Sequence, residues 1–432
     1  MEKVVCHSDA NCFYAACEMM SNPRLREIPF AVGGSKAERK GIILTANYPA
    51  KRRGVKTGMA LWEAERVCPD LLFVPPHYRV YQQYSTLLNS IYNSYSDRVE
   101  PFGLDESWID LTGCVTTFEQ GVKAANELNQ RIKKETGLTV SIGVANSKVT
   151  AKLGSDLHKP DKVNVIHPDH YKEIVWPLPV GDLLYVGRKT EAKLQSKGIC
   201  TIGDLASIDE EYLNHWFGKV GSVLFAFANG IDLSPVAPAG SSVPMKSCGN
   251  SETCPRDLTT DEDIKIMFFL LADSVGARMR EAGLAATTVS ISIRDNELTS
   301  ITRQCKLPIA TSLSGDIAQA AFRLFKRHWS WDRNKPVRSI GVRGDDLVSA
   351  EVPVQISFEY DASKMAEREA LEDTIIWLRQ RYGNKVIQRG IIYTDPLLGK
   401  LDAKANHTIH PIGVFYRGGV VQWGNWKMRV SA

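Results

Sequence analysis

The sequence predicts a multidomain protein of the α/β and α+β classes. Its 432 residues correspond to about three domains at roughly 150 residues each. Residues 1 to about 170 alternate short β-type runs with helical patterns, the pattern changes to short helices between 180 and 230, and from 245 helical runs alternate with β-type runs again. These changes along the chain predict separate folded units with different architectures.

The first region begins with a predicted strand near residues 3–9 that leads directly into a helix over 12–20. Further strands are expected at 28–33, 41–45, 98–104, 107–111 and 139–145. Between them, apolar residues recur at helical spacing and predict one buried helix face: Tyr81, Tyr84, Leu88, Ile91 and Tyr95. The two runs within 98–111 predict a hairpin that places Asp105 and Glu106 at its turn.

The later regions are separated by a segment without hydrophobic periodicity. Residues 233–244 contain three prolines, three serines and a glycine, which is typical of an interdomain tether. Residues 245–352 are expected to form helices at 261–281 and 313–329 and strands at 287–294, 300–307 and 337–343. A further helix is expected over 362–382, and no element is predicted for 390–432.

Composition excludes several classes of protein. No apolar run approaches the ~20 residues of a membrane helix, and the N-terminus has no secretory signal pattern, so we expect a cytoplasmic protein that does not bind membranes. The nine cysteines form no CxxC pair and are expected to be reduced, buried thiols. The net charge of +4 is too small to identify a nucleic-acid-binding protein by itself.

Three acidic residues are candidates for chemistry: Asp9 at the end of the first strand, and Asp105 with Glu106 at the hairpin. Neighbouring carboxylates repel each other unless a cation joins them. Mg²⁺ binds carboxylate oxygens together with substrate phosphates, and two such ions can catalyse phosphoryl transfer. The spacing alone is equally compatible with a surface turn and a helix-capping aspartate.

Basic segments accompany these acids. Six basic residues and no acid lie between positions 39 and 61, around the run Thr45-Ala46-Asn47-Tyr48-Pro49-Ala50. A second segment runs from Gly143 to Lys152 and on to Lys159, and on a helix Lys148 and Lys152 would share one face. Either segment alone could be a solvated basic surface. Together with the acids they favour binding of a triphosphate.

Four motifs in this order resemble those of Y-family translesion DNA polymerases, most of all the bacterial DNA polymerase IV group. They are Asp9-Ala10-Asn11-Cys12-Phe13-Tyr14-Ala15, the run from Thr45 to Ala50, Leu104-Asp105-Glu106-Ser107, and Ile142-Gly143-Val144-Ala145-Asn146-Ser147-Lys148. The resemblance implies a right-hand polymerase with a ferredoxin-like palm (1–18 and 75–165), small fingers (19–74), a helical thumb with a helix-hairpin-helix (166–230), a linker (231–244), an α+β little finger (245–352) and a C-terminal extension (353–432).

The resemblance also implies the roles of individual residues. Asp9, Asp105 and Glu106 would be catalytic and would bind two Mg²⁺ ions, together with the backbone carbonyl of Ala10. The nucleotide would be bound by Tyr14, Thr45, Tyr48, Lys51, Arg52 and Lys159. Among these, Tyr14 would exclude a ribose 2′-hydroxyl sterically. Without the resemblance, Tyr14 would be interpreted as an ordinary core aromatic.

DNA would be held by basic and glycine positions in three regions: Lys148, Lys152, Gly187, Arg188, Lys246, Arg333, Arg338 and Arg343. Contacts of this kind bind the phosphate backbone without reading bases. Gln355 to Phe358 resembles the short peptide that docks bacterial polymerases on the sliding clamp, although such strings also arise by chance. Three positions depart from the family pattern: Asn11 replaces a frequent acid, Lys51 a frequent arginine, and Tyr185 a glycine of the thumb hairpin.

The resemblance therefore predicts a template-directed, low-fidelity DNA polymerase that bypasses lesions. Its partners would be primer-template DNA and deoxynucleoside triphosphates, and we expect a monomer. One alternative is a non-catalytic, polymerase-like scaffold that recruits repair factors, but such a scaffold would be expected to lose the acids that this sequence retains. A palm-fold nucleotidyl cyclase is more distant, because it would leave the basic blocks without a purpose.

Overall fold

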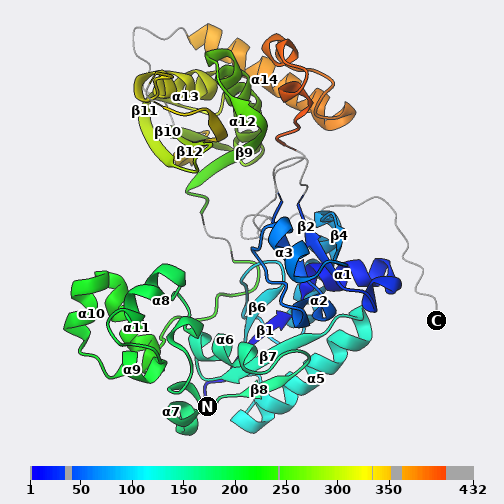
Figure 1. Cartoon of the computed structure of the whole chain (residues 1–432), viewed down its shortest axis with the longest axis vertical. Coiled ribbons are helices and arrows are strands. Elements are labelled where there is room, and N and C mark those ends of the chain that lie inside the picture. The colour runs from blue at the N-terminus through cyan, green and yellow to red at the C-terminus, as the bar shows by residue number, and fades with distance from the viewer. Residues whose placement is uncertain (1, 35–40, 242–243, 333, 352–361, 405–432) are drawn as a thin grey trace. The chain divides into compact units, whose positions relative to one another are not determined.

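The computed structural model describes residues 2–34, 41–241, 244–332, 334–351 and 362–404 (Figure 1). These residues form two compact units, one made of residues 2–33 and 42–241 and the other mainly of residues 244–404. Within the described part of the chain, no helix is long and apolar enough to span a membrane. The two units are described separately below.

The first unit is built on a five-stranded sheet with the order β5-β6-β1-β7-β8. The strands are β1 (Val5–Ala10), β5 (Val99–Pro101), β6 (Glu106–Asp110), β7 (Val140–Ala145) and β8 (Val163–Val165). The central strand β1 is antiparallel to both β6 and β7, and all six of its residues are buried. The predicted hairpin is confirmed, because β5 pairs antiparallel with β6 and the Phe102 N–H donates to the Glu106 carbonyl across the turn, at 2.8 Å.

Helices α1 (Phe13–Ser21), α4 (Tyr78–Asn93) and α5 (Phe118–Thr136) share one hydrophobic core with this sheet. The predicted helix face of α4 is confirmed, since Tyr81, Leu88 and Ile91 are fully buried. Helix α5 was not predicted. Local signals define its ends, because Thr117 caps the first turn and Gly137 ends the helix at a φ of 72°, a conformation that favours glycine.

A second core joins the sheet to α6 (Lys148–Leu157) and to the short helices that follow. Gly143 of β7 permits a very close approach of α6, because a Cβ atom there would lie 2.0 Å from the Ala151 carbonyl oxygen. The short helices predicted for 180–230 are confirmed as α8 (Arg188–Gln195), α9 (Ile202–Ala206), α10 (Glu210–Phe217) and α11 (Lys219–Ala228), preceded by α7 (Tyr171–Val175). The close packing of α6 brings its side chains within reach of β1 and β6.

A three-stranded sheet, β3-β2-β4, lies between α1 and α4 in the chain. It contains β2 (Phe30–Gly33), β3 (Ile43–Ala46) and β4 (Leu72–Val74), with helices α2 (Tyr48–Arg52) and α3 (Leu61–Val67). Buried Asn47 joins β3 to α2. Its side-chain oxygen accepts from the Ala50 N–H at 3.1 Å, and its amide donates to the Ile28 carbonyl at 2.8 Å. This bonding fixes the start of α2 and therefore the position of Tyr48.

The segment that the sequence predicts as a tether is largely bound to the first unit. The Ala237 N–H donates to the Glu100 carboxylate at 2.9 Å, the Ala239 N–H donates to the Asp97 carbonyl at 2.8 Å, and Val236 is only 2% exposed. The segment predicted as an interdomain tether is thus held against the first unit up to about residue 239, because a proline-rich segment can still donate backbone hydrogen bonds between its prolines.

The second unit contains a four-stranded antiparallel sheet with the order β11-β10-β12-β9. Its strands are β9 (Ser247–Leu258), β10 (Leu284–Asp295), β11 (Ser300–Thr311) and β12 (Val337–Ser349), and its core contains residues of α12 (Asp261–Glu281) and α13 (Ser314–His328). The predicted α+β pattern is confirmed. Apolar alternation did not reveal β9, because this edge strand consists mostly of polar residues.

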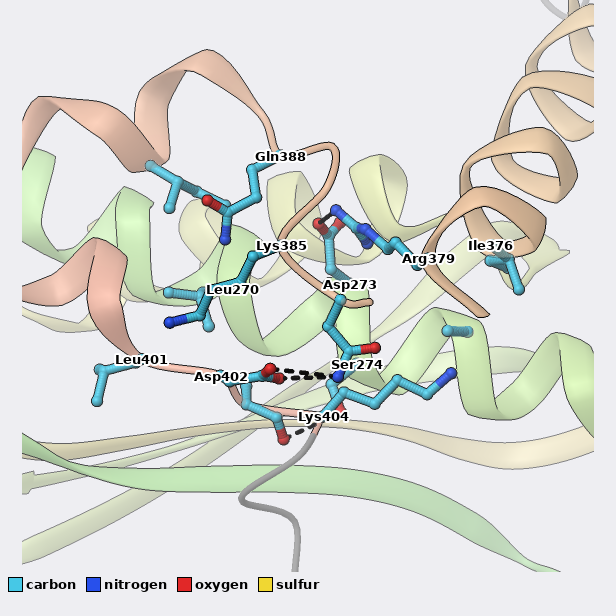
Figure 2. Close-up of a pocket in the computed structure, with 14 residues that line it drawn as sticks. Leu270, Asp273, Ser274, Ile376, Arg379, Lys385, Gln388, Leu401, Asp402 and Lys404 are labelled. Carbon is cyan, nitrogen blue, oxygen red and sulfur yellow. Dashed lines mark hydrogen bonds and ion pairs between the residues drawn. The ribbon is translucent and has the colours of Figure 1, made fainter. Parts of the chain in front are cut away.

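The described part of the C-terminal extension packs on α12 (Figure 2). Helix α14 (Ala362–Tyr382) is followed by a segment whose Ile392, Leu398 and Ala403 belong to the core of the second unit. Asp273 on α12 accepts from Arg379 at 2.8 Å and from Arg389 at 3.1 Å. The intervening cavity of about 40 Å³ has room for little more than water. Residues 362–404 thus complete the second unit instead of forming a separate extension.

All nine cysteines are free thiols, as expected. Five of them are buried, but Cys114 and Cys200 are exposed, so the prediction that the cysteines are buried is wrong for these two. Both lie in segments between regular elements, where an apolar sequence context does not imply burial.

Candidate active site

The three predicted catalytic acids lie together at one end of adjacent strands. Asp9, near the end of β1, is paired with Glu106, the first residue of β6, in the antiparallel register. The Ala10 N–H donates to the Asp105 carbonyl at 2.9 Å, which fixes the hairpin turn against the end of β1. Residues almost one hundred positions apart in the sequence therefore place their carboxylates around one pocket.

Two lysines neutralise part of this negative charge. The Lys152 Nζ lies 2.8 Å from Glu106 Oε2 and 3.4 Å from Asp9 Oδ2, and the Lys159 Nζ lies 2.8 Å from the same Asp9 oxygen. Burial disfavours the charged ammonium of each lysine, but the carboxylates outweigh it and raise the pKa of both. Both lysines also contact Asp156, so they bridge α6 to the acids.

The acids differ in how easily they ionise. Burial, followed by the charges of Asp9 and Glu106, raises the pKa of Asp105 to about 7. Burial also acts on Glu106, but its hydrogen bond from His7 and the charge of Lys152 lower its pKa to about 2. Without a further cation, the site therefore holds Asp105 partly protonated near neutral pH.

His7 was not identified from the sequence. It is fully buried on β1, its Nε2 lies 3.2 Å from Glu106 Oε2, and its Nδ1 lies 2.9 Å from the Ser155 hydroxyl. Burial lowers the pKa of His7, which favours a neutral imidazole beside the Glu106 carboxylate. A signal was present, because residues two apart on a strand share a face and His7 precedes Asp9 by two.

The donor atoms of this site suit hard divalent cations. The carboxylates of Asp9, Asp105 and Glu106 and the carbonyl of Ala10 offer only oxygen ligands, as Mg²⁺ prefers. Burial, followed by the charges of Asp9 and Glu106, raises the pKa of Asp105, and a bound cation would favour its ionised form. Among the residues that the structure describes, no group of three or more acidic, histidine or cysteine side chains is already arranged around a single point, so binding would require their side chains to rotate.

The acids open into a pocket of about 350 Å³. Its lining includes most of the predicted nucleotide-binding residues: Tyr14, Thr45, Tyr48, Lys51 and Lys159. Tyr14 is half-buried, and its ring stacks on that of Tyr81 with centroids 4.4 Å apart and planes at 13°. Burial, followed by the charge of Asp105, raises the pKa of Tyr14 to about 12, so its hydroxyl stays neutral.

The segment that begins α2 also lines the pocket. Tyr48 begins α2, and the Lys51 Nζ lies 5.2 Å from the centre of its ring. Burial raises the pKa of Tyr48, so this hydroxyl can donate a hydrogen bond at any physiological pH. Arg52 is exposed on the same helix and does not line the pocket, so its predicted contact with the nucleotide has no support from this geometry.

The predicted shared face of Lys148 and Lys152 on α6 is confirmed, but it meets carboxylates. The Lys148 Nζ lies 2.7 Å from Glu100 on β5 and 4.5 Å from the centre of the Trp108 ring, and its side chain is 13% exposed. A DNA phosphate would have to displace Glu100 to bind it. In the DNA-free protein both lysines pair with carboxylates of the sheet, and their contact with DNA stays a prediction from the sequence.

The predicted contacts in the helical segment lie on the surface. Gly187 caps the N-terminus of α8 and Arg188 is its first residue, and both are exposed. Tyr185, at the position where the family pattern has a glycine, adopts a φ of 73°, and its ring stacks on Phe227 with centroids 5.8 Å apart. At this turn Tyr185 therefore adds an aromatic side chain that a glycine would lack.

The predicted contacts in the second unit fall on its sheet. Lys246 is exposed just before β9. Arg343 on β12 faces Ser290 of β10 and Gly249 of β9 across the ladders and lies 2.7 Å from Asp345. Arg338 lies where the register of β12 with its neighbours shifts. Arg333 and the predicted clamp peptide from Gln355 to Phe358 lie outside the described residues.

Comparisons with known proteins identify related chains. Residues 8–156 match the impB/mucB/samB family, residues 245–358 match the C-terminal domain of the same family, and residues 181–232 match a thumb domain of DNA polymerase iota. The chain is 46% identical to DNA polymerase IV of Acetivibrio thermocellus over 93% of this chain and 100% of the relative. It is 37% identical to DNA polymerase IV 1 of Bacillus subtilis over 90% and 92% of the respective chains.

The fold agrees with a solved structure as well. A Y-family DNA polymerase chimera of Dbh and Dpo4 matches with a TM-score of 0.72 and 25% identity, over 80% of this chain and 99% of the other. The alternative of a non-catalytic scaffold is not favoured, because the relatives are named as polymerases and the three acids are present in one pocket. The chain belongs to the impB/mucB/samB family of Y-family DNA polymerases, close to bacterial DNA polymerase IV, and is a DNA-directed DNA polymerase that bypasses lesions in its template.

Proposed function

We propose that Asp9, Asp105 and Glu106, with the carbonyl of Ala10, hold two Mg²⁺ ions at the mouth of the pocket. The ions would neutralise the phosphates and lower the barrier to attack by the primer 3′-oxygen on the α-phosphorus, with pyrophosphate leaving. The observation that carries the proposal is the convergence of these acids from β1 and the β5–β6 turn onto the same pocket as Tyr48 and Lys159.

When metal ions and a nucleotide bind, Lys152 and Lys159 would exchange their present ion pairs for new ones. In the nucleotide-free protein they neutralise Glu106 and Asp9, and the arriving metal ions would take over that role. Lys159 would be released towards the triphosphate, where Tyr48 and Lys51 form the other side of the pocket. Charge thus remains nearly balanced as the substrate enters, which limits the cost of burying a triphosphate.

Tyr14 would set the preference for deoxyribose. Its ring is held flat against Tyr81, so it cannot move aside without losing that stacking contact. A ribose 2′-oxygen would therefore clash with a fixed surface.

By the same resemblance, the five-stranded sheet is the palm, the three-stranded sheet and its helices are the fingers, residues 166–230 are the thumb, and the sheet of the second unit is the little finger. The exposed positions Gly187, Arg188, Lys246 and Arg343 are the proposed contacts with primer-template DNA. We also propose that the chain acts as a monomer in the cytoplasm. The clamp peptide from Gln355 to Phe358 stays a prediction from the sequence.

A primer-extension assay with Mg²⁺ tests the catalytic proposal. Asp105→Ala should abolish extension of a labelled primer, whereas a gel-shift assay should show primer-template binding within about twofold of the parent chain. Asp110→Ala is the matched control, because Asp110 lies at the far end of β6 and its carboxylate accepts from the Thr112 N–H, at 2.9 Å, away from the three acids. Extension by the Asp105 variant at the parent rate would refute the assignment.

A further inference from the structure

Asn11 lies two residues after Asp9, is 2% exposed, and forms hydrogen bonds through both polar atoms of its side chain. Its Oδ1 accepts from the Asp161 N–H at 2.7 Å and from the Thr139 hydroxyl at 3.3 Å, and its Nδ2 donates to the Ser141 hydroxyl at 2.9 Å. Its own N–H donates to the Thr139 carbonyl at 2.9 Å. The residue is thus fixed to β7 and its preceding turn, and it holds the loop that contains Asp161.

That loop carries Lys159. On its other side, the Asn164 amide donates to the His158 carbonyl at 3.2 Å and to the Gly154 carbonyl at 2.9 Å. The loop is therefore attached to the core immediately before Lys159 and again two residues after it. Between these two attachments, the Lys159 ammonium reaches Asp9 at 2.8 Å.

The attachment at Asp161 works against a backbone preference. Asp161 has a φ of 57°, in the left-handed region that aspartate adopts more easily than most residues but less easily than glycine. The bond from its N–H to Asn11 and the ion pair of its carboxylate with Lys133, at 2.6 Å, hold this conformation. Loss of the Asn11 bond would leave a part-buried N–H without its partner and would release the loop.

We propose that Asn11 is a positioning residue that holds the Lys159 ammonium over the nucleotide pocket. This inference rests on the proposed contact of Lys159 with the triphosphate. The link is direct, because the strand end that carries Asp9 continues into Asn11, and Asn11 binds the loop of Lys159. One short segment therefore fixes both the metal-binding acid and the phosphate-binding cation relative to each other.

The chemistry of the side chain defines informative substitutions. Asn11→Leu has a similar size but cannot accept from Asp161, and Asn11→Ser remains polar but is too short to reach it. Asn11→Asp keeps the acceptor, and the hydroxyls of Thr139 and Ser141 can both donate to it. We expect the first two variants to raise the KM for the incoming deoxynucleotide about tenfold with kcat changed less than about threefold, and Asn11→Asp to restore the KM to within about threefold.

A matched control separates this effect from general loosening of the fold. Asn129 on α5 is 4% exposed and donates to the Val140 carbonyl at 2.8 Å, but it has no bond to the Lys159 loop. Asn129→Leu should lower the melting temperature as much as Asn11→Leu does and leave the KM unchanged. If both variants raise the KM equally, the effect is structural and the inference fails.

A double-mutant cycle with Lys159→Ala identifies the route of the effect. If Asn11 acts through Lys159, the KM of the double variant Asn11→Ser with Lys159→Ala should equal that of Lys159→Ala alone. If the KM of the double variant instead rises by the product of the two single-variant factors, Asn11 does not act through Lys159 and the inference is wrong. The proposed contact of Lys159 with the nucleotide would still stand. An unchanged KM in Lys159→Ala alone would refute the proposed contact itself, and the inference would fall with it.

Discussion

Asp105→Asn should stabilise the metal-free protein at neutral pH while abolishing catalysis. Burial and the charges of Asp9 and Glu106 raise the pKa of Asp105 to about 7. A carboxyl whose pKa is higher in the folded than in the unfolded chain contributes stability that is fully present below its ordinary pKa and is lost as the pH rises through the folded value. Between about pH 4 and pH 7 the parent chain should therefore lose stability that the asparagine variant keeps.

The size of this effect follows from the shift. Each pKa unit corresponds to about 1.4 kcal/mol, and because the side chain is only half-buried we expect on the order of 2 kcal/mol at pH 8. The assay is chemical denaturation of both proteins in EDTA at several pH values from 4 to 8. Added Mg²⁺ should stabilise the parent chain at pH 8 and have a smaller effect on the variant, because one ligand has lost its charge.

Asp110→Asn is the control, since this residue lies on the same strand but is not a neighbour of the acidic cluster. The difference in unfolding free energy between Asp110→Asn and the parent chain should not increase between pH 4 and pH 8. If Asp105→Asn has the same stability relative to the parent chain at pH 4 and at pH 8, Asp105 does not carry the electrostatic cost that we assign to it.

Three further predictions concern sugar selection and packing. Tyr14→Ala should increase the kcat/KM for ribonucleotides relative to deoxynucleotides by at least about tenfold, because the ring that excludes the 2′-oxygen is gone, and an unchanged ratio would contradict that role. Gly143→Ala should destabilise the first unit by more than about 3 kcal/mol in urea denaturation, since its Cβ would overlap the Ala151 carbonyl, whereas Gly187→Ala has free space and should cost less than about 1 kcal/mol. Leu398→Ala should destabilise the second unit by about 2–4 kcal/mol, because Leu398 is fully buried. Leu397 is 45% exposed, so Leu397→Ala is the control. If the two variants are equally stable, residues 362–404 are not part of that core.

Apolar content and periodicity predicted the helices that contribute most to the cores. Helix α12 occupies 261–281 as expected and is buried around most of its surface, and Tyr81, Leu88 and Ile91 of α4 are buried. The edge strand β9 gave no such pattern, because it is mostly polar and only Cys248, Cys254 and Leu258 contribute apolar side chains to the core. The docking of residues 232–239 was also missed, since it depends on backbone donors whose acceptors, such as Glu100, lie far away in the sequence.

The motifs around Asp9, Tyr48, Asp105 and Lys159 already specify the acids, the phenol and the ammonium of the candidate site. Which basic residues lie at that site, and what holds them there, depends on contacts between segments that are distant in the sequence. Lys148 and Lys152 have similar sequence surroundings, yet one meets Glu100 and the other Glu106 and Asp9, because the contact between α6 and the sheet sets their partners. The roles of Asn11 and His7 could not be predicted for the same reason. The interactions of a buried side chain depend on the atoms around it, and most of those atoms belong to distant parts of the chain.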